Sequence, residues 1–314
     1  MWLFLAFTSA ALLGFYDVCK KHALQGNAVL TVLWLNTLFC SLLFLPAIVL
    51  SAMGVLDSST PCYVPATTGT EQCYIFLKAI IVLASWLCGY YGMKWLPLTI
   101  VGPINATRPV MVLVGAMLVF AERLNAYQWI GVCLAIVSFF LLSISGKKEG
   151  IDFRHNKWIV LVVMAALFGA VSGLYDKYLM APAANGGTGI NRMTVQSYYN
   201  LYQLALMSVA VSLMRWHQAR HAATHDKAQP AAAFHWTWTI PLISVFLSVA
   251  DFAYFYSLSL TGAMISVVSM IRRSSVVVSF FVGALLFHER NLRGKIIDLA
   301  LVLLGMLFLY LGSS

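Results

Sequence analysis

Ten stretches of apolar residues follow one another along the chain, separated by short polar segments. A helix needs about 20 mostly apolar residues to cross a bilayer, and each stretch is close to that length. They lie at residues 2–19, 28–53, 75–93, 97–121, 126–145, 158–178, 194–214, 236–259, 262–287 and 294–312. This pattern predicts an all-α membrane protein with ten transmembrane helices.

Two of these stretches carry arginine near their middle. Arg108 lies within the fourth stretch, and Arg272 and Arg273 lie within the ninth. An arginine at the centre of a bilayer costs about 2.5–3.5 kcal/mol on insertion scales. A side chain of this kind is expected to face a wet cavity or a partner charge, so function is the first hypothesis for all three.

An internal repeat divides the chain into two units of five helices. Gly-x-Tyr-Asp closes the first and sixth stretches, at residues 14–17 and 173–176, and Phe-x-Glu-Arg ends the fourth and ninth, at 120–123 and 287–290. Because five is odd, the second unit enters the membrane upside down, and inverted repeats are typical of transporters. The predicted units are residues 1–145 and 158–314, joined by a polar linker at 146–157.

Composition supports a multi-pass membrane protein. Hydrophobic residues make up 61% of the chain, charged residues make up 10%, and the mean hydropathy is +0.83. The net charge of +9 does not indicate a nucleic-acid partner, because most basic residues fall in short loops, where they set orientation in the lipid bilayer. The first stretch begins at Trp2 without a basic segment or a cleavage site, so we expect a retained helix.

The loop charges predict the orientation. Counted along the chain, odd-numbered loops hold thirteen lysines and arginines and even-numbered loops hold four. The positive-inside rule then places the odd loops in the cytoplasm and both termini outside.

The repeat architecture and its short motifs resemble the drug/metabolite transporter superfamily, EamA-like branch, over essentially the whole chain. The resemblance implies a basket of helices around a central cavity, lined by the first four helices of each repeat. It implies peripheral fifth and tenth helices that can face a second copy in a homodimer, and a location in the cell membrane, for which we expect the bacterial inner membrane. Relatives export amino acids, metabolites or drugs, or exchange nucleotide sugars and sugar phosphates, and usually keep both termini inside.

The arginines are the main substrate-binding candidates. The alternative is structural pairing of their guanidinium groups with helix carbonyls or buried carboxylates. Asp251 is the one carboxylate we expect at comparable depth, and a single aspartate cannot neutralise Arg108, Arg272 and Arg273. A positively charged cavity is therefore favoured, in which Asp251 pairs with one arginine or couples transport to protons.

Three further residues are candidates for the substrate path. Asn105 precedes Arg108 by three residues and shares its helix face. Tyr91 and Tyr256 occupy matched positions in the third and eighth helices and could line the path, although aromatic belts at the membrane interface explain most such tyrosines.

Other polar residues have local explanations. Asp17 and Asp176 are expected to pair with neighbouring lysines at their helix ends. Cys62 and Cys73 share one loop and form a candidate disulfide if that loop lies outside the cytoplasm. No spacing suggests a metal site, a cofactor or an enzyme motif.

The sequence thus predicts a secondary active transporter or exchanger of a small organic metabolite, with an anion bearing carboxylate or phosphate favoured. Arginine suits such groups because its planar fork binds them through two hydrogen bonds. Two alternatives stay open: an exporter of zwitterionic amino acids, neutral metabolites or drugs, and a membrane sensor that transports nothing.

Overall fold

The computed structural model describes residues 2–111, 125–147, 151, 153, 155–180, 186–224, 234–259, 268, 271–289 and 292–312. This part of the chain forms ten α-helices and contains no strand. The helices are α1 (Trp2–Leu24), α2 (Val29–Ala52), α3 (Gly69–Trp95), α4 (Leu98–Ala106), α6 (Ala126–Lys147), α7 (Lys157–Met180), α8 (Arg192–Thr224), α9 (Thr239–Ser259), α11 (Ser275–Leu286) and α12 (Leu292–Leu311).

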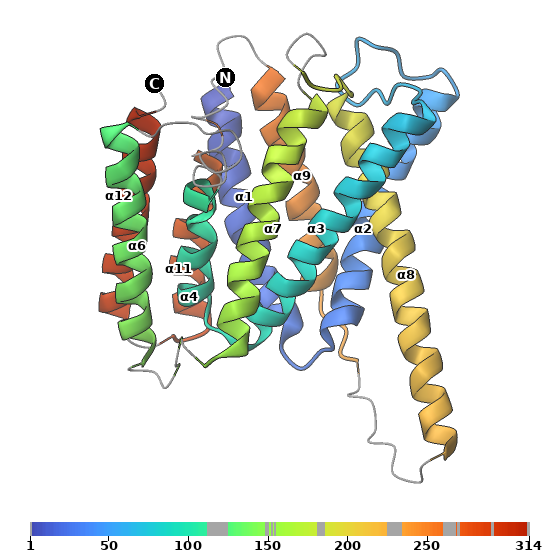
Figure 1. Cartoon of the computed structure of the whole chain (residues 1–314). Helices are drawn as coiled ribbons and strands as arrows, with labels where there is room; N and C mark the ends of the chain where they lie inside the picture. The colour runs from blue at the N-terminus through green and yellow to red at the C-terminus, as the bar shows by residue number, and fades with distance from the viewer. Residues whose placement is uncertain are drawn as a thin grey trace.

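The helices form one bundle with both termini at the same end, drawn at the top of Figure 1. Among the described residues, seven helices are long and apolar enough to cross a membrane: α1, α2, α3, α6, α7, α9 and α12. The prediction of an all-helical, multi-pass membrane protein is therefore confirmed. Helix α8 is longer than the predicted seventh span, 194–214. It continues to Thr224 and extends beyond the lower end of the bundle.

We had expected each arginine-bearing stretch to form one continuous helix, but the structure shows an interruption in both. The helix that holds α4 is interrupted at Thr107, and α11 begins after a similar turn at Ser274. Thr107 has φ −77° and ψ −5°, and Ser274 has φ −65° and ψ −6°. Each hydroxyl donates to the carbonyl three residues earlier, at 2.7 Å and 2.6 Å respectively. Such bonds compete with the helical ladder and bend helices, so both arginine segments lie beside a turn.

A residue from the second half of the chain caps α4. The carboxylate of Glu289 accepts hydrogen bonds from the amides of Leu98 and Thr99, at 2.7 Å and 3.1 Å, and from the Thr99 hydroxyl. The first amides of a helix have no partner within it and attract negative charge. Lys295 of α12 donates to the same Thr99 hydroxyl at 2.8 Å. The lower end of α4 is thus held by residues that follow α11.

Helices from the two halves of the chain pack side by side. The principal pairs are α1 with α9, α3 with α7, α2 with α8, and α6 with α12, while α4 and α11 lie together within the bundle. The core is built from the apolar faces of these helices, with α1, α2, α3, α4 and α9 contributing most of its largest cluster.

The loop between α2 and α3 corrects one prediction. Cys62 and Cys73 are both free thiols, so the candidate disulfide is wrong. Order at this end comes instead from a capping box on α3, in which the Thr68 hydroxyl accepts from the Glu71 amide while Glu71 accepts from the Thr68 amide.

The α6–α12 pair depends on a close approach at two glycines. A Cβ on Gly131 would lie 2.8 Å from the Gly305 carbonyl oxygen and 2.7 Å from a methyl of Leu309. We expect Gly131→Ala to lower the melting temperature of the purified protein, because overpacking a tight contact costs about 1–3 kcal/mol.

Gly173→Ala is the matched control, since a Cβ there meets nothing within 4 Å. Its melting temperature should stay level or rise, as alanine is the better helix former. Equal behaviour of the two variants would show that the α6–α12 contact adapts freely.

Candidate functional site

Arg272 and Asp251 form an ion pair inside the bundle. Asp251 lies on α9 and is buried, and Arg272 lies in the short helical segment 271–273, just before the turn at Ser274 that precedes α11. The guanidinium also lies over the ring of Tyr254, 4.2 Å from its centroid. On the other side of the carboxylate, the hydroxyl of Tyr199 is 3.5 Å from Oδ2. The predicted pairing of Asp251 with one arginine therefore matches the geometry, and that arginine is Arg272.

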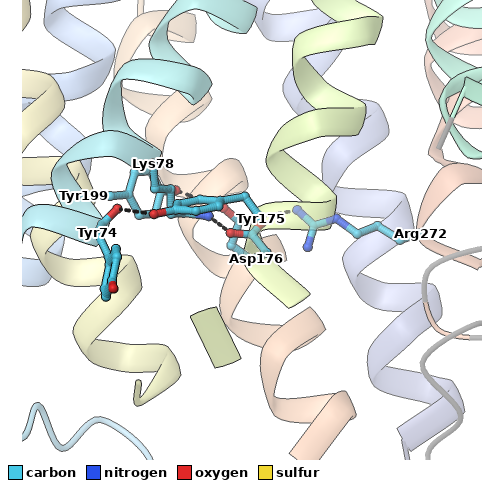
Figure 2. A network of polar contacts seen from close by, with 7 residues as sticks. Tyr74, Lys78, Tyr175, Asp176, Tyr199 and Arg272 are labelled. Carbon is cyan, nitrogen blue, oxygen red and sulfur yellow. Dashed lines mark hydrogen bonds and ion pairs between the residues drawn. The ribbon is translucent and has the colours of Figure 1, made fainter. Parts of the chain in front are cut away.

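A second ion pair joins α3 to α7. Lys78 is buried on α3 and contacts the carboxylate of Asp176, as Figure 2 shows beside Arg272 and Tyr199. Its ammonium lies 5.1 Å from the centroid of the Tyr199 ring. Asp176 was expected to pair with a neighbouring lysine at its helix end, but the side chain of Lys177 lies outside the described residues. The described partner, Lys78, comes from another helix, because α3 and α7 pack against each other with these residues facing.

Arg108 has a donor without a partner. Its Nη2 donates to the Asn105 carboxamide oxygen at 3.1 Å, while its buried Nε has no hydrogen-bond partner in the described part of the chain. The guanidinium lies against Gly169 of α7, where a Cβ would come within 2.7 Å of Cζ. Asn105 and Arg108 thus share a helix face as predicted, and Gly169 leaves the space that the guanidinium fills.

The three arginines come together. Arg273 lies within electrostatic reach of Arg108 and Arg272, and no ion pair of Arg273 is found among the described residues. Like charges repel one another more strongly in a medium of intermediate dielectric constant than in water. Charges gathered in this way favour an anion between them.

A third ion pair lies on α1, toward the lower end of the bundle. Lys20 donates to Asp17 at 2.8 Å, as expected from their spacing on α1. The Lys20 ammonium also lies over the ring of Tyr16, at 4.2 Å, and near that of Tyr90, at 5.3 Å. Asp17 and Lys20 are both within electrostatic reach of Arg108.

We name these eight residues the central charged cluster. It comprises five basic side chains and three acidic ones, a formal excess of two positive charges: Lys20, Lys78, Arg108, Arg272, Arg273, Asp17, Asp176 and Asp251.

The two matched tyrosines are not brought together. Tyr91 follows Lys78 by thirteen residues, which is about 20 Å of helix, and packs at the edge of the main core. Tyr256 lies toward the upper end, stacked on Phe252 with its ring 5.5 Å from the Arg192 guanidinium. Tyr90, which precedes Tyr91, is the tyrosine of α3 that faces the charged cluster.

A cleft of about 600 Å³ opens at the lower end of the bundle. It lies between the C-terminal turns of α1, the start of α9 and the end of α11, with His22, Thr239 and His288 in its lining. His22 contacts the Thr239 hydroxyl at 3.3 Å through Nδ1. None of the arginines lines this cleft. The described residues also contain no group of three or more His, Cys, Asp or Glu side chains that could hold a metal ion.

Sequence reasoning missed two sets of buried polar residues. Asp298 on α12 is also buried, so Asp251 is not the one buried carboxylate that we expected. On α8, the carboxamides of Gln196 and Gln203 are buried and have no hydrogen-bond partners among the described residues. Their spacing of seven residues within an apolar stretch is the signal that could have identified them, since it puts both on one helix face.

The Asp251–Arg272 pair generates a prediction. Asp251→Asn and Arg272→Gln should each destabilise the protein by about 3–5 kcal/mol, because each leaves a buried charge without its partner. The double variant should lose less than the sum of the two. Melting curves of the purified protein give the comparison, and Arg215→Gln, at an exposed arginine of α8, is the control. Strictly additive losses would show that the two groups act independently.

Comparison with known proteins adds the family. Residues 1–144 match the model of the EamA-like transporter family. No curated protein matches the chain significantly. The matched segment contains α1, α2, α3 and α4 and ends within α6. Over residues 1–144 the chain is therefore similar to the EamA-like transporter family, which is part of the drug/metabolite transporter superfamily.

Proposed function

We propose that this protein is a secondary active transporter or exchanger of a small organic anion that bears carboxylate or phosphate. The observation that carries the proposal is the convergence of Arg108, Arg272 and Arg273, of which only Arg272 has an ion-pair partner among the described residues. The central charged cluster holds two more positive than negative charges. An anion bound there relieves the repulsion and accepts the unused hydrogen bonds, including that of the Arg108 Nε.

The architecture we propose is two inverted five-helix repeats, residues 1–145 and 158–314, with the linker 146–157 between them. The matched turns at Thr107 and Ser274 support it, as does the pairing of α1 with α9 and of α3 with α7. Interrupted helices at the interface of inverted repeats form the substrate sites of many transporters. The family match also ends within the fifth predicted helix.

Zwitterionic substrates are the second candidate, because Asp251 and Arg272 offer both signs of charge side by side. An amino acid could place its carboxylate against an arginine and its ammonium against Asp251. The same carboxylate is our candidate for proton coupling. We retain the bacterial inner membrane and a homodimer as further parts of the proposal.

Ligand-dependent melting tests the function. Purified protein is titrated with carboxylates and phosphate monoesters, with amino acids, and with amines of similar size. Stabilisation that follows RT ln(1 + [L]/Kd) is expected for anions. Arg108→Gln and Arg273→Gln should each weaken anion binding at least tenfold, and Gly169→Ala should do so by displacing the Arg108 guanidinium.

Arg215→Gln, at an exposed position, is the control and should bind anions as the native chain does. Stabilisation by amines alone would overturn the anion proposal. Stabilisation by amino acids but not by other anions, lost in Asp251→Asn, would favour the zwitterion. Arginine variants that melt earlier but bind every anion normally would assign these residues to structure.

The orientation yields a separate prediction. In a background lacking the six native cysteines, Ser58→Cys lies in the exposed loop after α2, and Gln25→Cys lies in the exposed loop after α1. The loop charges place Ser58 outside and Gln25 in the cytoplasm. A membrane-impermeant thiol reagent should label only Ser58→Cys in intact cells. Labelling of Gln25→Cys alone would reverse the orientation.

A further inference from the structure

The interior face of α8 carries carboxamides that no residue in the described part of the protein satisfies. Gln196 is 1% exposed and Gln203 is 0% exposed, and neither the nitrogen nor the oxygen of either amide has a hydrogen-bond partner among the described residues. The Asn200 carboxamide oxygen and the Asn36 nitrogen on α2 are also unpartnered. A buried amide without a partner is costly, and native interiors almost always pair such groups. A molecule from outside the chain can supply the missing partners.

Packing shows which way these side chains face. Val195 belongs to the same buried cluster as Ile75 on α3, and Met193 belongs to the same buried cluster as Phe44 on α2. At 100° per residue, Gln196 points between these two directions. The opposite side of α8 faces outward, where Val209 is 59% exposed. Gln203, seven residues after Gln196, is about 20° from it around the helix. Both carboxamides therefore face the interior between α2 and α3.

That interior adjoins the central charged cluster. Tyr199 lies about one helical turn from each glutamine, between them, and its hydroxyl is the group 3.5 Å from Asp251. Figure 2 shows Tyr199 in the same polar network as Lys78 and Arg272. Unpaired amides thus flank the tyrosine that contacts the cluster, one turn above and one turn below it.

We infer that Gln196 and Gln203 bind the uncharged part of the anion, and that this part carries several hydroxyl or amide groups. The inference rests on the proposed function and names the substrate class of the same site. A carboxamide offers two donors and an acceptor with two lone pairs, which suits a hydroxyl or amide on a ligand. A hydrocarbon body leaves these amides buried and unpaired, and sites built for hydrogen bonding reject such analogues strongly.

Matched pairs of anions isolate the effect of the body. Gluconate and hexanoate each have six carbons and one carboxylate, and glycerol 3-phosphate and propyl phosphate each have three carbons and one phosphate. Dissociation constants come from ligand-dependent melting of the full-length purified protein. In at least one pair the hydroxylated member should bind at least tenfold more tightly than its alkyl partner.

Substitution then assigns the preference to α8. Gln196→Leu and Gln203→Leu should bring that ratio close to one while the affinity for the alkyl anion is kept or improved. Both variants should melt at a higher temperature than the native protein without ligand, because each removes an unpaired buried amide. Gln72→Leu is the matched control, since Gln72 on α3 already bonds the Tyr202 hydroxyl at 2.7 Å and the Thr67 hydroxyl at 2.5 Å. It should melt earlier and keep the preference.

The outcomes separate this inference from the function on which it rests. If no member of either pair stabilises the protein, the anion site itself is overturned for both head groups. If members of a pair bind equally, or the alkyl anion binds more tightly, the amides hold only water and the inference fails. A preference that survives both leucine variants would place its origin outside α8.

Discussion

Charge buried in an apolar bundle is the constraint on which the rest of the structure depends. Arg272 is held by Asp251 on one side and by the ring of Tyr254 beneath it. Lys78 and Lys20 are held in the same manner, each by a carboxylate and one or more tyrosine rings. Since the desolvation of an ion costs several kcal/mol even in real proteins, such partners must be in place for these helices to pack. Arg108 and Arg273 receive less compensation, which makes them the positions where an external anion gains most.

The interrupted helices place these charges where they can act. In an unbroken helix, the backbone amides and carbonyls around Arg272 and Arg273 would all be hydrogen-bonded within the helix itself. The turns at Thr107 and Ser274 instead use side-chain hydroxyls to occupy backbone carbonyls. Irregular backbone at membrane depth is tolerated only when protein or a cavity surrounds it. The two turns therefore belong in the interior, where α4 lies against α11.

Hydropathy was sufficient to identify the seven helices that are long and apolar enough to cross a membrane among the described residues, because it reports directly on burial in lipid. The sequence also identified the three arginines, whose cost in an apolar stretch is apparent without coordinates. It could not assign Asp176 to Lys78, since that pair depends on how α3 meets α7 rather than on spacing along one helix. The buried glutamines of α8 were missed for a related reason. Glutamine is common at helix surfaces, and only packing reveals that Gln196 and Gln203 face inward.

The cap on α4 has a consequence for the order in which the protein is assembled. Leu98 and its partner Glu289 are 191 residues apart in the chain. Chains emerge from the ribosome N-terminal end first, so α4 enters the membrane long before the carboxylate that satisfies its first amides is made. The Arg108 guanidinium likewise lies against Gly169 of α7, which is made after the whole first half of the chain. The first half can therefore reach its final packing only after α11 and Glu289 have been inserted, and truncated chains that stop before this point should be substrates for membrane quality control.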